Sequence, residues 1–137
     1  MEKEKYLFDT DTITNILKQR PSERLLKKLK GLSRDRQFIS TITIGEIVYG
    51  AMKSASPGRH LRNLQDILIP RVNIVGLDAK AAFFYGEIRA EQENKGKPLS
   101  TADLQIASIA RANNLTLVTG NTKHFKLIDN FHVENWM

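Results

Sequence analysis

The stretch that most constrains the fold is residues 6–11, where three apolar residues, Tyr-Leu-Phe, are followed at once by Asp9, Thr10 and Asp11. The apolar run is typical of a short buried strand, and helical spacing resumes over residues 12–17. Ligands of open α/β sheets bind in the crevice beyond the carboxyl ends of the strands, so we expect Asp9 to mark a functional site. Asp11 or Thr10 has the alternative role of capping the following helix, for which Asp9 lies too early.

Strand-like and helix-like segments alternate along the rest of the chain. We predict strands at residues 37–40, 72–76, 115–119 and 132–134, and helices at residues 11–19, 23–32, 43–51, 61–68, 79–95 and 100–114. Alternation of this kind favours a parallel sheet covered on both faces. No repeat or linker interrupts it. We therefore expect an α/β fold with one domain over residues 1–137 and a parallel central sheet flanked by helices.

The composition limits the chemistry that this chain can perform. It has no cysteine, and its three histidines lack zinc spacing, so disulfides and thiolate metal sites are excluded. No apolar run is long enough for a membrane span or a signal-peptide core. We expect a soluble cytoplasmic protein that does not enter a membrane.

The 137 residues carry a formal charge of +6, which favours polyanionic partners such as RNA or an acidic protein segment. Much of the excess lies between residues 18 and 36, in Lys18, Arg20, Arg24, Lys27, Lys28, Lys30, Arg34 and Arg36. Their spacing around Leu25, Leu26 and Leu29 is equally typical of the solvated face of an amphipathic helix. The sequence leaves both interpretations open.

Two further acids, Glu46 and Asp103, are predicted in the first turns of their helices. The segments 43–46 and 100–103 each fit the capping-box pattern, in which the acid bonds back to the helix start. Alternatively, both acids meet Asp9 at one end of the sheet, where carboxylates repel one another unless a cation neutralises them. Mg²⁺ and Mn²⁺ prefer such oxygen ligands, and a metal of this kind activates water for attack on a phosphoryl group.

Four blocks in order resemble the PIN-domain ribonucleases, specifically the VapC toxins of bacterial toxin–antitoxin pairs. They are Tyr-Leu-Phe-Asp-Thr-Asp at 6–11, Ile-Ser-Thr-Ile-Thr-Ile-Gly-Glu-Ile-Val-Tyr-Gly-Ala at 39–51, Gly-Lys-Pro-Leu-Ser-Thr-Ala-Asp-Leu-Gln-Ile-Ala at 96–107 and Leu-Thr-Leu-Val-Thr-Gly-Asn-Thr-Lys-His-Phe at 115–125. Val-Glu-Asn-Trp at 133–136 extends the resemblance, which covers nearly the whole chain.

The resemblance implies a metal-dependent endoribonuclease that uses Mg²⁺ or Mn²⁺. By motif position its acidic cluster is Asp9, Glu46 and Asp103, and a fourth polar position falls on Asn121. Many PIN domains carry an aspartate at that fourth position, so this chain departs from the fuller pattern; the alternative role of Asn121 is that of a turn residue.

The same resemblance implies an RNA substrate, with transfer RNA a common class, a cognate VapB-type antitoxin and a homodimer. The candidate RNA contacts are basic groups that would position the strand by its phosphates, namely Lys53, Lys123 and His124.

Two other functions compete with this one. Residues 7–12 also resemble the strand-end Asp-x-Asp motif of haloacid-dehalogenase-like phosphatases, in which Asp9 would be the nucleophile, Asp11 the acid–base group, and Ser40 or Thr41 the second-strand hydroxyl. The later part of the chain argues against it, since the last core strand leads into Gly120 and Asn121 with no acid. The third possibility is a non-catalytic RNA-binding module that keeps the fold without the chemistry.

Overall fold

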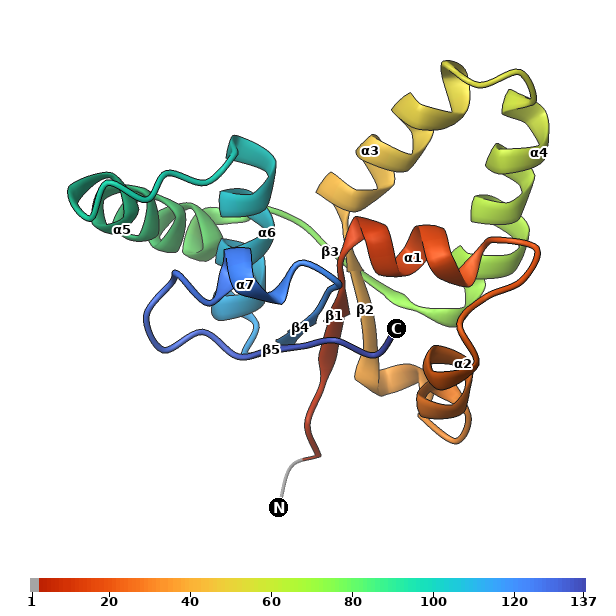
Figure 1. The fold of residues 1–137 in the computed structure, drawn as a ribbon, viewed down its shortest axis with the longest axis horizontal. Helices are drawn as coiled ribbons and strands as arrows, with labels where there is room; N and C mark the ends of the chain where they lie inside the picture. Colours follow the sequence, from red (N-terminus) through yellow and green to blue (C-terminus); the bar gives the residue numbers. More distant parts are fainter. Residues whose placement is uncertain (1–2) are drawn as a thin grey trace.

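The structure is a computed structural model that describes residues 3–137, and its centre is a five-stranded sheet whose neighbouring strands all run parallel (Figure 1). The strands lie in the order β3-β2-β1-β4-β5, with β1 in the middle. Their bounds are β1 (Tyr6–Phe8), β2 (Gln37–Ser40), β3 (Asn73–Val75), β4 (Thr116–Val118) and β5 (Val133–Glu134). The predicted α/β fold with a parallel central sheet is confirmed.

Ten helical segments connect these strands within the described residues. They are α1 (Thr10–Ile16), α2 (Glu23–Leu29), η1 (Arg34–Arg36), α3 (Thr41–Met52), α4 (Pro57–Arg62), η2 (Asn63–Leu68), η3 (Ile69–Arg71), α5 (Ala79–Asn94), α6 (Thr101–Ala112) and α7 (Thr122–Phe125). The helix predicted over 61–68 starts earlier, at Pro57. Proline suits this position because the first residues of a helix have no partner for their N–H groups, so its missing N–H costs nothing. The basic helix predicted over 23–32 ends at Leu29, before Gly31, whose φ is +84°.

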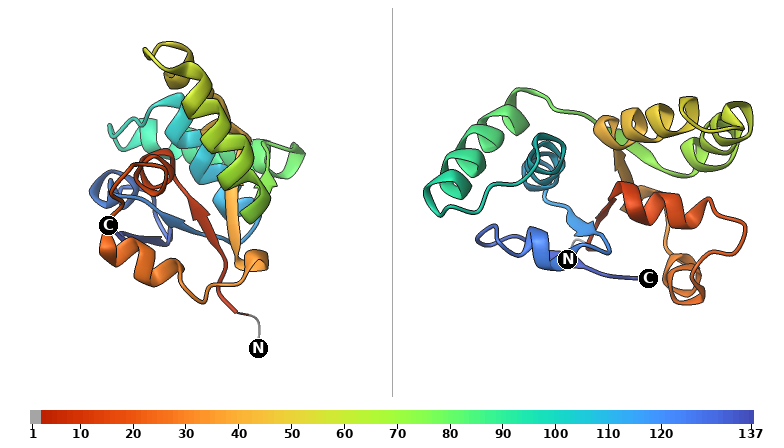
Figure 2. Two further views of the ribbon diagram at one scale, coloured as in Figure 1. Left: turned by 90° about the vertical axis from the view of Figure 1, so that its right-hand side faces the viewer. Right: turned by 45° about the horizontal axis from the view of Figure 1, so that its top comes forward.

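The alternating side chains of β1 divide the interior into two clusters. Leu7 packs with residues of α5, α6 and α7, whereas Tyr6 and Phe8 pack with residues of α1, α2 and η2 on the other face. Figures 1 and 2 show the same division, with α5, α6 and α7 on one side of the sheet and α1 and α2 on the other. Each fully buried side chain of this kind contributes roughly 1.5–3 kcal/mol relative to exposure, so the strand that delivers Asp9 is held rigidly.

The carboxyl ends of β1 and β4 lie next to each other. Phe8 pairs with Val118 in register, and the Asp9 amide donates to the Val118 carbonyl at 2.9 Å. The hydroxyl of Thr12 also donates to the Val118 carbonyl, at 3.0 Å, so the start of α1 is tied to the end of β4. Side chains that follow the two strands therefore converge at one edge of the sheet. Among residues 3–137, no helix is both long enough and apolar enough to cross a bilayer.

Candidate active site

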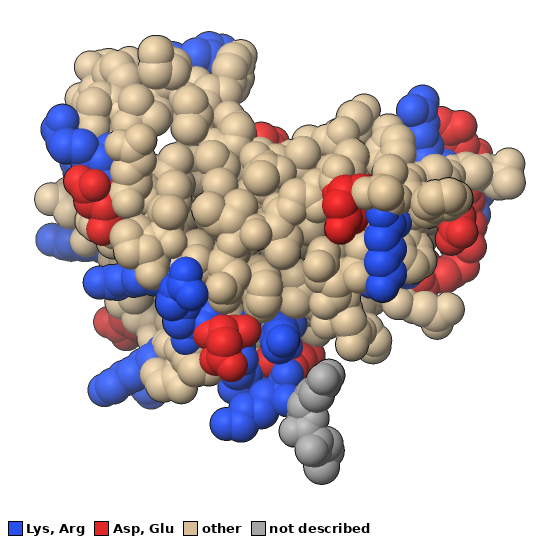
Figure 3. All heavy atoms as spheres, turned by 180° about the vertical axis from the view of Figure 1, so that it is seen from behind, with Lys and Arg blue, Asp and Glu red and all other residues tan. Residues whose placement is uncertain are grey.

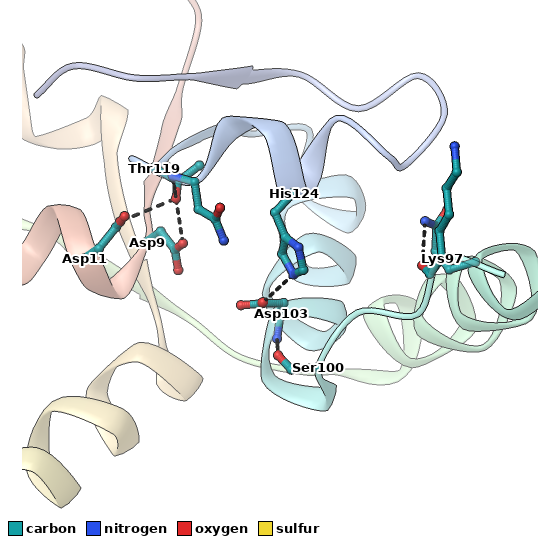
Figure 4. Close-up of polar contacts among 9 residues, drawn as sticks. Asp9, Asp11, Lys97, Ser100, Asp103, Thr119 and His124 are labelled. Atoms are coloured by element: carbon teal, nitrogen blue, oxygen red, sulfur yellow. Dashed lines mark hydrogen bonds and ion pairs between the residues drawn. The ribbon is translucent and has the colours of Figure 1, made fainter. Parts of the chain in front are cut away.

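Asp9 stands at the junction of β1 and α1 with its carboxyl group buried, 7% exposed. One carboxyl oxygen accepts a hydrogen bond from the Thr10 amide at 2.8 Å, and the other accepts from the Thr119 hydroxyl at 2.8 Å (Figure 4). Asp9 is itself the N-cap of α1, so the expectation that it lies too early to cap, and that Thr10 or Asp11 does so, is wrong. The helix begins at Thr10 because the chain turns directly after the third strand residue.

Burial raises the pKa of the Asp9 carboxyl to about 6. The hydrogen bonds from Thr119 and Thr10 favour the charged form, but the negative charges of Asp11 and Asp103 work against them. A carboxylate in this position is stabilised by any cation that reaches it. The site is therefore electrostatically prepared for a positive group.

Asp11 is an acid that the site assignment from sequence omitted. It is exposed, and its Oδ2 accepts from the Gly120 amide at 2.9 Å, which ties the first turn of α1 to the segment after β4. The loop passes close to its neighbours here: a Cβ at position 120 would lie 2.9 Å from Asp11 Oδ2 and 2.7 Å from Met137 Cε, so a larger residue would displace these two side-chain ends. The Asp-x-Asp spacing of residues 9–11 was the sequence signal that could have identified Asp11. In the structure, this acid supports the loop after β4 through its hydrogen bond with the Gly120 amide.

Glu46 lies in the second turn of α3, so the prediction that it lies in the first turn is wrong. The helix begins two residues earlier than predicted because the Ser40 hydroxyl accepts from the Thr43 amide at 3.0 Å and caps it. The predicted capping box over 43–46 is accordingly absent within residues 3–137. Glu46 instead accepts a hydrogen bond from the Thr10 hydroxyl at 2.7 Å, and this bond links it to the residue that follows Asp9.

Asp103 lies in the first turn of α6, as its sequence position indicates, with Ser100 as the N-cap. The Ser100 hydroxyl accepts from the Asp103 amide at 3.2 Å, which is one half of a capping box. The Asp103 carboxylate is 3.0 Å from His124 Nε2 on α7 (Figure 4). The carboxylate of Asp103 therefore contacts the segment that follows β4.

The remaining predicted residues occupy different places. Asn121 is exposed and precedes α7; its amide donates to the Thr119 hydroxyl at 3.1 Å, while its side chain makes no capping bond. Lys123 is exposed on α7. Lys53 follows the last turn of α3, roughly 10 Å along the helix from Glu46, where its ammonium group contacts the Tyr49 ring and hydroxyl.

The acids come from three separate segments, β1–α1, α3 and α6, and the β4–α7 segment adds the supporting groups Thr119, Gly120 and His124. Among residues 3–137, no three His, Cys, Asp or Glu side chains lie close enough to hold a metal ion together. The donors are nonetheless all oxygen, and Mg²⁺ is commonly held by one or two carboxylates with water completing its shell. The carboxylates around Asp9 therefore fit a hard divalent cation.

The phosphatase alternative finds no support in these contacts. The Ser40 hydroxyl, one of its two candidate second-strand groups beside Thr41, is fully buried and caps α3, and Asp11 is bonded to the Gly120 backbone. Neither group is placed to act on a phosphate beside Asp9.

Comparison with known proteins gives one consistent result. Residues 6–130 match the model of the PIN domain family. The chain is 39% identical to "Ribonuclease VapC2" of Rickettsia felis over 96% of this chain and 97% of the relative, and 33% identical to "tRNA(fMet)-specific endonuclease VapC" of Shigella flexneri over 96% and 98%. Its fold is similar to the crystal structure of DNA-bound VapBC from Salmonella typhimurium, with a TM-score of 0.90 and 35% identity over 98% of this chain and all of that one.

Proposed function

Because this chain belongs to the PIN-domain family and, within it, to the VapC ribonucleases, we propose that it is an endoribonuclease toxin whose reaction needs Mg²⁺ or Mn²⁺. The metal requirement is inferred from the environment of Asp9. Its carboxyl group is buried, and its pKa is raised by burial and by the negative charges of Asp11 and Asp103. A carboxyl in this environment gains most from a divalent cation, which would offset the mutual repulsion of the acids.

The residues that would hold the ion are Asp9 and Asp103, with Glu46 as a third acid on the same side. When bound, the ion supplies charge neutralisation and an activated water for attack on a phosphodiester. Thr119 and the Thr10 amide hold the two Asp9 oxygens in place. The Thr10 hydroxyl positions Glu46, and His124 fixes the orientation of Asp103.

Transfer RNA is the substrate class that we propose. The relatives from Shigella flexneri and Salmonella typhimurium, 33% and 35% identical to this chain, are both described as tRNA(fMet)-specific endonucleases. Both alignments cover 96% of this chain and 98% of the relative, so the proposal extends from proteins of the same length and organisation. The net positive charge suits a polyanion of this kind. With this substrate we also propose a cytoplasmic location, where transfer RNA is found.

A cognate antitoxin is the proposed protein partner, in line with the VapBC complexes among the similar structures. A groove of about 330 Å³ between α1, α3 and α4 is a suitable place for one of its segments. Thr10 and Glu46 line one part of it, and Ile47, Gly50 and Ala51 provide apolar surface. A segment that fills the groove would reach Glu46 and so block the site.

We also propose a homodimer. Five large apolar side chains are exposed on α3, on β3 and in and before α5: Tyr49, Met52, Ile74, Leu77 and Phe83. Figure 3 shows the molecule from the side opposite to that of Figure 1. The centre of this face carries few charged side chains, and Lys and Arg gather toward its margins. Exposed apolar side chains, where they form a larger patch, mark protein–protein interfaces.

The test is cleavage of purified bacterial transfer RNA by the antitoxin-free protein in Mg²⁺, in Mn²⁺ and in chelator. We expect discrete products with either metal and none in chelator. Asp103→Asn should lower the rate more than about a hundredfold, beyond the usual effect of a residue that only supports a ligand. Glu87→Gln on α5 is the matched control, since it removes one exposed carboxylate that has no part in the proposed site.

Cleavage by Asp103→Asn at the parental rate, with an unchanged melting curve, would remove Asp103 from the site. Intact RNA in every condition together with tight metal-independent binding would favour the non-catalytic RNA-binding module instead.

A further inference from the structure

The basic segment, residues 18–36, carries the whole formal charge excess of the chain. It holds eight of the 21 Lys and Arg and two of the 15 acids, an excess of six, while the remaining residues have thirteen of each sign. The charge is therefore a local property of the turn after α1, of α2 and of η1. The catalytic site, in contrast, is a cluster of acids.

Part of this segment has a structural role. Arg34 donates to the Pro70 and Val72 carbonyls and to Asn73, and Arg36 donates to the Glu4 carbonyl. Four other cations are exposed, and their side chains have no hydrogen bond or ion pair to any residue of the described chain: Lys18, Arg20, Lys27 and Lys30. We call these four the free basic surface. Their charge is not used by the fold.

The surroundings of α2 suit a phosphate backbone better than a protein. An open hollow of about 560 Å³ there is lined by Glu23, Arg24, Leu26, Lys27 and Lys30. Leu26 is its one apolar side chain, and no aromatic residue lines it. Protein interfaces are depleted in lysine and built around aromatic or apolar anchors, whereas contacts to nucleic-acid backbones are made mainly by Lys and Arg.

The free basic surface is connected to the catalytic end by α1. This helix begins directly after Asp9 and ends at Ile16; the chain then turns and descends to α2 (Figures 1 and 2). Lys18 lines the same groove as Thr10 and Glu46, so the first cation of the surface borders the site. Because the acids of the site repel phosphates, attraction for an RNA has to come from elsewhere on the protein.

We propose that the free basic surface is a second RNA contact, which holds the backbone of a structured RNA along α1 and α2 while the cleaved strand lies at Asp9 and Asp103. This inference rests on the proposed RNA substrate and deepens it. It implies that the protein selects RNA large enough to reach both places. A short single strand would occupy the catalytic end alone.

The test compares two triple variants with the same net charge. The first is Arg20→Gln, Lys27→Gln and Lys30→Gln; the control is Arg59→Gln, Arg62→Gln and Lys80→Gln, three exposed cations of α4 and α5. Binding of labelled bacterial transfer RNA and of a six-nucleotide single-stranded RNA is measured by fluorescence anisotropy in chelator, over a salt series. Cleavage is measured separately in Mg²⁺, and melting curves check the fold.

We expect the first variant to bind transfer RNA about tenfold to a hundredfold more weakly, with the log–log salt slope reduced by about two to three, and the control to change little. Binding of the six-nucleotide RNA and the kcat of cleavage should stay unchanged. Equal losses in the two variants would mean that net charge alone matters and would overturn the proposal. So would competition by poly-glutamate as strong as by unlabelled transfer RNA, which would assign the surface to an acidic protein.

The outcome does not depend on catalysis. If the parent protein cleaves nothing yet the first variant loses transfer-RNA binding, the second contact stands and the proposed nuclease function fails. If the parent cleaves transfer RNA and the first variant binds it normally, the nuclease function stands and the second contact fails.

Discussion

The acidic end of the sheet and the basic segment concentrate opposite charges by different structural means. Asp9, Glu46 and Asp103 come from segments far apart in the sequence, and each is held by a named hydrogen bond or ion pair. The free basic surface comes from one consecutive stretch and is held by none in the described chain. Charges held in place suit a reaction that needs exact placement, whereas exposed cations without partners suit an irregular phosphate backbone.

The largest effect is expected at Asp9, where the ionised carboxylate should lower the stability of the folded protein. The pKa of Asp9 in the folded protein, about 6, lies above its value of 3.8 in the unfolded chain. The protonated form is therefore favoured by folding, so this contribution to stability is complete below about pH 4 and is lost as the pH rises through 6. The Asp9→Asn variant has an amide that cannot ionise at this position. In chelator, its stability relative to the parent should rise by roughly 2.5 kcal/mol between pH 4 and pH 7.5, measured by urea unfolding.

Comparison of the two proteins at each pH cancels the other titrating groups. Glu87→Gln, which changes an exposed acid on α5, serves as the control. Parallel stability curves for the parent and Asp9→Asn would mean that burial does not disfavour the Asp9 charge. The acidic end of the sheet would then carry no electrostatic cost for folding.

A smaller effect should come from a divalent cation at neutral pH. Mg²⁺ at about ten times its dissociation constant should stabilise the parent by about 1.4 kcal/mol, or raise Tm by a few degrees for a chain of this length. Asp9→Asn should respond much less. The measurement is a thermal melt with NaCl at matched ionic strength as the control; equal shifts in both proteins would indicate general screening.

The smallest effect concerns the basic segment itself. The Lys28 ammonium group lies 5.5 Å from the centre of the Trp136 ring, so Lys28→Gln should lose roughly 0.5–1 kcal/mol of stability. Lys27→Gln, one residue earlier and without an aromatic partner in the described chain, should be neutral within a few tenths. Urea unfolding of the two variants tests this. A loss at Lys27 as large as at Lys28 would contradict the view that the free cations play no part in the fold.

The sequence predicted the sheet and most helices because their signals are local. The apolar run of residues 6–8, the N-cap at Asp78 and the helical spacing of residues 101–112 all appear in the structure. Helix starts were less predictable. Ser40 and Thr43 both carry a hydroxyl suited to capping, and only the end of β2 decides that Ser40 is the cap.

The support of the site was hidden for a different reason. Bonds such as Thr119 to Asp9 and Gly120 to Asp11 join residues 110 and 109 positions apart. Periodicity and capping patterns involve residues only a few positions apart. They therefore identify the acids but do not predict which distant groups form hydrogen bonds with them. The charge excess of the basic segment was visible from the start, but which of its cations are free depends on contacts such as that of Arg34 with the Pro70 carbonyl.

The position of β1 between β2 and β4 has a consequence for the order of synthesis. The ribosome makes β1 and Asp9 first, yet their neighbours β4 and Thr119 emerge more than a hundred residues later. Pairing at such sequence separation is among the slow steps of folding. A partly made chain therefore has Asp9 without the hydrogen bond from Thr119 that holds its carboxyl group, so the geometry of the acid is completed only when nearly the whole chain is made.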